Sequence, residues 1–174
     1  MGFEHANGAI MAEKTKTLRD LFHETLKDIY FAEKKILAAL PKMAKAAQSE
    51  ELKAAFEKHE SETEDHVARL EKVFAEIDET PRGKTCDAIL GIIEEGQEVM
   101  KEFKGKPALD AGLLAAAQAV EHYEIARYGT LKTWASRSFN AILIHNDLLV
   151  VQHSIFRDVP RHDQNKPIST QMTA

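Results

Sequence analysis

Five residues fall within the helical spacing of apolar positions in this sequence but have side chains that can bind a cation: Glu33, Glu62, His66, Glu121 and Glu124. The members of each neighbouring pair lie three or four residues apart. On a helix, residues at that spacing share one face, so each pair can point toward one place. Three segments of the chain could therefore each bring carboxylates to a common interior position.

Carboxylates inside a protein core cost several kcal/mol unless a positive group pairs with them. Two divalent or trivalent metal ions would remove the repulsion among these acids. Carboxylate and imidazole ligands suit iron, manganese or zinc. A single cysteine, Cys86, excludes a multi-cysteine zinc site or iron–sulfur cluster. The pattern predicts a di-metal centre of iron or manganese, with zinc as a further candidate, and it assigns no catalytic residue.

A metal-free interpretation remains open at this point. The inward acids could pair with His59, His66 or water in a structural bundle that works by dimerising, with its function on the surface. The acidic run HESETEDH would then be a solvated face, as we expect for Glu60 and Glu64 in any case. Phosphotransfer from a histidine is disfavoured because both His59 and His66 are predicted to face inward.

Helices must position these residues, and their starts are visible in the sequence. Thr17 can cap one helix and Ser49 a second. Pro41 falls inside the first pattern and is expected to kink or tighten that helix without ending it. The predicted inward positions of the first helix are Leu18, Leu21, Phe22, Thr25, Ile29, Ala32, Ile36, Leu37 and Leu40.

The remaining elements follow a break at residues 78–85 (DETPRGKT). A short helix is predicted from about Cys86 to Phe103, and a long one from about Pro107 to Trp134. Two long helices with a short loop, then a long connection carrying a small helix, match the single-crossover order of a ferritin-like four-helix bundle. That fold needs one more long helix after residue 136.

Composition limits the class of protein. A chain of 174 residues fits one compact domain, and its net charge of −5 disfavours binding to nucleic acid. It contains no signal-peptide core and no uninterrupted apolar run of roughly 20 residues, so no membrane partner is expected. We predict a cytoplasmic protein with a flexible extension over residues 1–16, a helical bundle over 17–156 and a tail over 157–174.

Three long runs resemble the YciE/YciF-type ferritin-like family: LRDLFHETLKDIYFAEKKILAALPKMAKAA, HESETEDHVARLEKVF and AAAQAVEHYEIARYGTLKTWA. The resemblance covers Thr17–Ala135. It implies a ferritin-like bundle, usually a homodimer, associated with bacterial stress responses, with oxidation or peroxide-detoxifying chemistry as an expectation. It also implies Glu33, Glu62, Glu121 and Glu124 as metal ligands. His66 follows Glu62 by four residues, whereas ferritin-like proteins usually separate Glu and His by three.

The chain departs from this resemblance after Ala135. All 19 glutamates lie at or before Glu124, and the charge changes from −8 over residues 1–124 to +3 over 125–174. The segment resembles a frameshifted or otherwise altered C-terminus. We therefore expect an irregular or partial fourth helix over residues 139–156, an extended mobile tail after it, and a metal site open on one side.

Overall fold

Two capped helices make the first half of the fold. The computed structural model describes residues 15–138 and Leu148, and in it α1 spans Leu18–Ala46 and α2 spans Glu50–Glu76. The Thr17 hydroxyl accepts a hydrogen bond from the Asp20 amide while the Asp20 carboxylate accepts one from the Thr17 amide, which completes a capping box. The Ser49 hydroxyl caps α2 by accepting a hydrogen bond from the Leu52 amide. Both predicted starts are confirmed, and α1 continues through Pro41.

The crossover between the two halves lies along α1 before the short helix begins. The Lys84 amide donates to the Lys27 carbonyl at 3.0 Å. A Cβ on Gly83 would lie 3.3 Å from the Phe31 Cα, so the glycine allows this close approach. Helix α3 then spans Asp87–Glu102 and α4 spans Leu109–Ser138, close to the predicted bounds.

A partly buried hydrogen-bond chain fixes the start of α3. The Tyr123 hydroxyl of α4 donates to Asp28 on α1 at 2.6 Å, and the Cys86 sulfur lies 3.0 Å from the same hydroxyl. Because the tyrosine proton is used on Asp28, the thiol is the donor to Tyr123. Burial, followed by the bond to Asp28, raises the Tyr123 pKa. Cys86 is therefore a packing residue that joins α3 to α1 and α4.

At the other end of the bundle, the first turn of α4 holds the connection between α1 and α2. The Asp110 carboxylate accepts hydrogen bonds from the backbone amides of Gln48 and Ser49, both at 2.8 Å. These two amides lie immediately before Glu50, the first residue of α2, where backbone donors have no acceptor within the helix. The contact sets the axial position of α4 against the α1–α2 pair.

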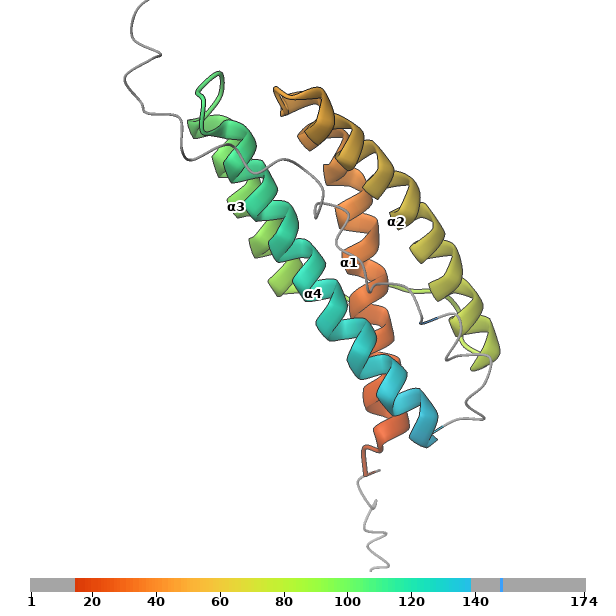
Figure 1. Ribbon diagram of the computed structural model, residues 1–174. Helices are drawn as coiled ribbons and strands as arrows, with labels where there is room; N and C mark the ends of the chain where they lie inside the picture. The colour runs from red at the N-terminus through yellow and green to blue at the C-terminus, as the bar shows by residue number, and fades with distance from the viewer. Residues whose placement is uncertain (1–14, 139–147, 149–174) are drawn as a thin grey trace, which may run out of the picture.

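Helix α1 is central in this arrangement, with α2 on one side of it and the α3–α4 pair on the other (Figure 1). Over residues 15–138, the predicted helical bundle with a short crossover helix is confirmed. The expectations for residues 1–14, 139–147 and 149–174 lie outside the described residues, and Leu148 is buried. In the part of the chain that the structure describes, no helix combines the length and apolar character needed to cross a membrane.

Two predicted core positions on α1 are wrong. Leu18 and Leu21 are 37% and 49% exposed, whereas Phe22 is fully buried. Leu21 lies about 100° around the helix from Phe22, and Leu18 belongs to the first turn at the helix end. Periodicity places both leucines near the apolar stripe, but it does not show where the covering helices stop.

Substitution by alanine should change the stability of the protein in opposite directions at two glycines of α4. A Cβ on Gly112 would lie 2.6 Å from Val99 Cγ1 of α3, whereas a Cβ on Gly129 meets nothing within 4 Å. Gly129→Ala should stabilise the protein by about 0.5–1 kcal/mol through helix propensity. Gly112→Ala should instead lower the free energy of unfolding by about 1–2 kcal/mol. The side chain of Val99 is β-branched and has few rotamers, so it cannot easily move away from the added methyl group. Urea unfolding of both variants tests this, and equal responses would contradict it.

Candidate metal centre

Three helices each bring one buried ligand residue to the same place: Glu33 from α1, His66 from α2 and Glu124 from α4. His66 Nδ1 lies 3.5 Å from Glu33 Oε1 and 3.6 Å from Glu124 Oε1. One ligand atom from each residue lies within 4.8 Å of the other two. This buried group of two glutamates and one histidine could hold a metal ion.

The spacing of these atoms suits a shared cation better than direct hydrogen bonds. Separations of 3.5 and 3.6 Å exceed the usual N–H···O distance of about 2.9 Å. Two ligands at about 2.1 Å from one ion, in tetrahedral geometry, lie roughly 3.4 Å apart. The donor set of two carboxylates and an imidazole also suits iron, manganese or zinc.

Several buried polar atoms at this place lack hydrogen bonds. Among the described residues, Glu33 Oε2, both carboxylate oxygens of Glu124, and His66 Nδ1 have no hydrogen-bond partner. The Thr63 hydroxyl, on the same face of α2, also has none. Such atoms normally find partners when buried, because leaving them unpaired costs about 1–3 kcal/mol each. A cation would satisfy the carboxylate oxygens and the imidazole nitrogen together.

The pKa values of Glu33, His66 and Glu124 show how these three side chains share protons when no metal ion is bound. Burial first, and then the charge of Glu124, raise the pKa of Glu33 to about 7. Burial alone would lower the His66 pKa, but Glu124 and Glu33 outweigh it and raise that pKa to about 9. Burial would likewise raise the Glu124 pKa, which His59 and His66 instead hold below its ordinary value. Without a metal ion, a protonated His66 therefore lies between the two acidic side chains.

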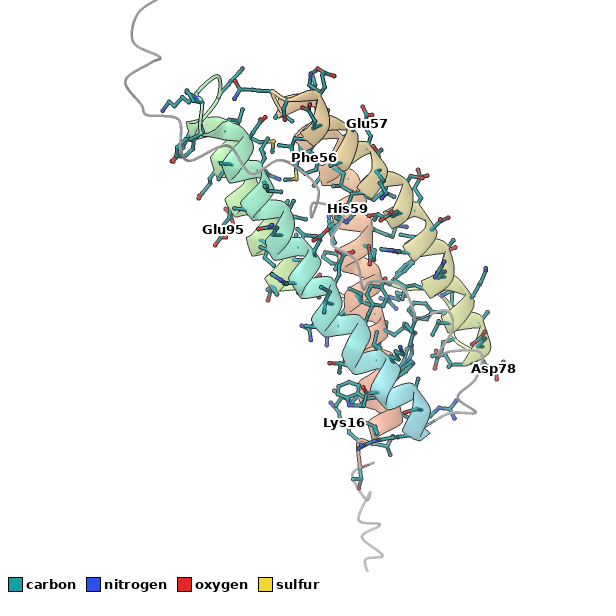
Figure 2. The ribbon with its side chains drawn as sticks, viewed as in Figure 1. Lys16, Phe56, Glu57, His59, Asp78 and Glu95 are labelled. Atoms are coloured by element: carbon teal, nitrogen blue, oxygen red, sulfur yellow. The ribbon has the colours of Figure 1, made fainter. Side chains whose placement is uncertain are left out.

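Two further side chains surround the group. The Tyr128 hydroxyl donates to Glu33 Oε1 at 2.6 Å, and its ring packs edge-on against the His66 ring with centroids 5.9 Å apart. His59 Nε2 lies 3.6 Å from Glu124 Oε2. Figure 2 shows His59 and Phe56 on the inner side of α2, with Glu57 on its outer side. Such neighbours can fix the orientation of the ligand carboxylates.

The sequence analysis anticipated one of these two neighbours and not the other. His59 was predicted to face inward, and its burial confirms that orientation. Tyr128 is absent from the predicted site residues, although it follows Glu124 by four residues and so shares its face of α4. That spacing is the signal that could have linked Tyr128 to the site.

Two of the predicted ligands lie outside the triad of Glu33, His66 and Glu124. Glu62 is 41% exposed, and its carboxylate lies 3.7 Å from Lys58 Nζ. Glu121 is buried one turn before Glu124, but its carboxylate does not join the group of ligand atoms. The described residues therefore bring together ligands for one ion, and the role of all five residues as ligands stays a prediction.

Removing the Tyr128 hydroxyl should be costly. Tyr128→Phe leaves the buried Glu33 carboxylate without its short hydrogen bond, so we expect a loss of about 1.5–3 kcal/mol and a higher Glu33 pKa. Tyr30→Phe is the matched control, because Tyr30 bonds Glu71, an exposed residue, at 2.8 Å. That variant should lose at most about 1 kcal/mol. Chemical denaturation of both proteins at pH 7.5 measures the difference, and similar losses would contradict the prediction.

Comparison with known proteins gives consistent matches over the helical part of the chain. Residues 17–141 match the family model described as a domain of unknown function, DUF892. The chain is 43% identical over 123 residues to the protein YciF of Escherichia coli, covering 70% of this chain and 74% of that protein.

Two solved structures have a similar fold. One is YcfI from Rhodopseudomonas palustris, described as a proposed structural protein, with a TM-score of 0.74 and 42% identity over 79% of this chain and 87% of the other. The second is the E. coli stress protein YciF, with a TM-score of 0.71 and 40% identity over 77% and 84% of the two chains.

Proposed function

This chain belongs to the DUF892 family, and we propose that it binds a divalent transition-metal ion through Glu33, His66 and Glu124. The observation that carries the proposal is the buried triad, whose ligand atoms lie at metal-site spacing with carboxylate oxygens that lack hydrogen bonds. Iron and manganese are the proposed metals, with zinc as a further candidate, because the ligands are oxygen and nitrogen without thiolate. Two glutamates would neutralise one divalent ion.

The surroundings define what the protein's own residues would do there. Tyr128 donates a hydrogen bond to Glu33 Oε1 and would hold the Glu33 carboxylate in the orientation that faces His66. His59 would orient the Glu124 carboxylate from the opposite side. Iron or manganese at this place would supply redox chemistry toward oxygen or peroxide. A role in stress responses is supported by the description of the E. coli relative as a stress protein.

Metal content and thermal stability test the proposal together. Protein purified from cells supplied with iron and manganese should retain metal, with a ratio near one ion per chain for the triad. A ratio near two would support the two-ion centre predicted from the sequence. Metal at 100 times its Kd should stabilise the fold by about 2.7 kcal/mol, or roughly 5–10 °C in Tm. Absence of metal, with an unchanged Tm after chelation and re-addition, would refute the proposal.

A metal-free structural bundle is the second candidate function, and one observation favours it. A protonated His66 already lies within 3.6 Å of both carboxylates and can neutralise part of their charge. The description of the R. palustris relative points the same way. Under this alternative, the protein keeps full stability in chelator and purifies with little metal.

A further inference from the structure

A small apolar cavity lies between α1, α3 and α4 and extends to His59 on α2. It offers about 20 Å³ in which a water-sized molecule can be centred. Aliphatic side chains form most of its wall, including Ile36 and Leu40 of α1 and Ile92 of α3. Lys42 and Gln97 also line it and are exposed, so they lie where the cavity meets solvent. Buried His59 is the polar group at its inner end.

Small residues leave this space open. Gly96 of α3 and Ala117 of α4 line the cavity, and a Cβ added to Gly96 would lie 3.4 Å from the Ala116 Cβ, an ordinary contact distance. A larger residue is therefore not excluded by the backbone at this position. The cavity follows from the residues present, because their short side chains do not fill the gap between the helices.

The wall determines which molecules fit. A cavity needs roughly 10–15 Å³ of such space to hold one water, which also requires two to four polar partners. Apolar cavities with few polar groups stay dry and take up small apolar molecules such as xenon. Hydrogen peroxide, like water, needs several hydrogen bonds, whereas dioxygen needs none. The size and the apolar wall both favour a diatomic apolar molecule.

We propose that this cavity is a binding site for a small uncharged apolar molecule of the dioxygen class, held beside the triad. His59 connects the two places, because it lines the cavity and its Nε2 lies 3.6 Å from Glu124 Oε2. The significance of this position rests on the proposed metal site, but binding to the cavity does not. The structure thereby favours dioxygen over peroxide as the molecule that reaches the triad from this side.

Dioxygen itself is the probe, because it is paramagnetic and speeds the relaxation of nearby methyl groups. The full chain, labelled at methionine and isoleucine methyls and kept in chelator, would be compared under nitrogen and under pressurised oxygen. Met43, Met100 and Ile36 line the cavity, whereas Ile29 and Ile89 are fully buried elsewhere. We expect several-fold larger relaxation enhancement at the first group. Peroxide at millimolar concentration should leave the same methyl resonances unshifted.

Two neighbouring alanines supply the matched variants. Ala39 lines the cavity and Ala38 is exposed beside it, outside the lining. Ala39→Leu should abolish the enhancement, and Ala38→Leu should leave it unchanged. Gly96→Ala gives a milder block should Ala39→Leu unfold the protein. Equal enhancement at Ile29 and Met43, or persistence in both blocked variants, would overturn the proposal. Since chelated protein is used, a failed metal assay leaves this result interpretable.

Discussion

Glu124→Gln should lower the affinity for Mn²⁺ by roughly 100-fold or more, because it removes one of the two charged ligands of the triad. The same change should destabilise the metal-free protein by about 3 kcal/mol, since His66 and His59 lose a buried charged partner. Titration with Mn²⁺ and chemical denaturation in chelator measure the two effects separately. Mn²⁺ is chosen because it stays divalent in air more readily than iron.

Glu62→Gln is the matched control for this experiment. Its side chain is 41% exposed and its carboxylate lies 3.7 Å from Lys58 Nζ, so the change should cost less than about 0.5 kcal/mol. Metal affinity should stay unchanged. Loss of binding in Glu62→Gln equal to that in Glu124→Gln would mean that the ligand set follows the sequence prediction rather than the triad.

Stability of the metal-free protein should fall as pH rises from about 5 to about 9. The Glu33 pKa is raised from 4.5 to about 7, and the His66 pKa from 6.5 to about 9, so the folded state holds both protons more tightly than the unfolded state. The Glu33 contribution is lost between pH 4.5 and 7, and that of His66 between 6.5 and 9. The Glu124 pKa is lowered, and its contribution is lost below pH 4.5.

Metal affinity should have the opposite pH dependence, because an ion must displace the protons on Glu33 and His66. The Tm gained on adding Mn²⁺ should therefore grow from pH 5.5 to 8, while Tm in chelator declines. Glu33→Gln should flatten the decline in chelator, since it removes one titrating group and a partner of the second. A flat wild-type profile in chelator would contradict the assigned proton balance.

The helices were predictable because their signals are local. Thr17 and Ser49 supply hydroxyls that cap helix starts within three residues, and the turn-forming run at 78–85 breaks the pattern between two helices. Local periodicity also gave the inward positions of Glu33, His66, Glu121 and Glu124, all of which are buried. These features depend on residues within one or two turns, which a sequence displays directly.

Only the tertiary structure decided which side chains of α2 lie on its buried face near the candidate metal site. His59, Thr63 and His66 follow one buried stripe at spacings of four and three residues. Glu62 lies about 100° around the helix from Thr63, which turns its carboxylate toward Lys58 at the surface. Sequence periodicity allowed either Glu62 or Thr63 to face inward at this turn, because polar residues on both sides of the buried stripe hide where it ends. Packing against α1 decided between them.

The sequence by itself determined that carboxylates and histidines would lie on the inner faces of three helices in a single-crossover order. Only the tertiary structure decided that Glu33, His66 and Glu124 meet while Glu121, one turn away, does not join them. Periodicity gives the angle of a residue around its helix axis, but not the height at which it faces another helix. That height depends on contacts far from the site, such as the hydrogen bonds that the Asp110 carboxylate accepts from the two backbone amides just before α2.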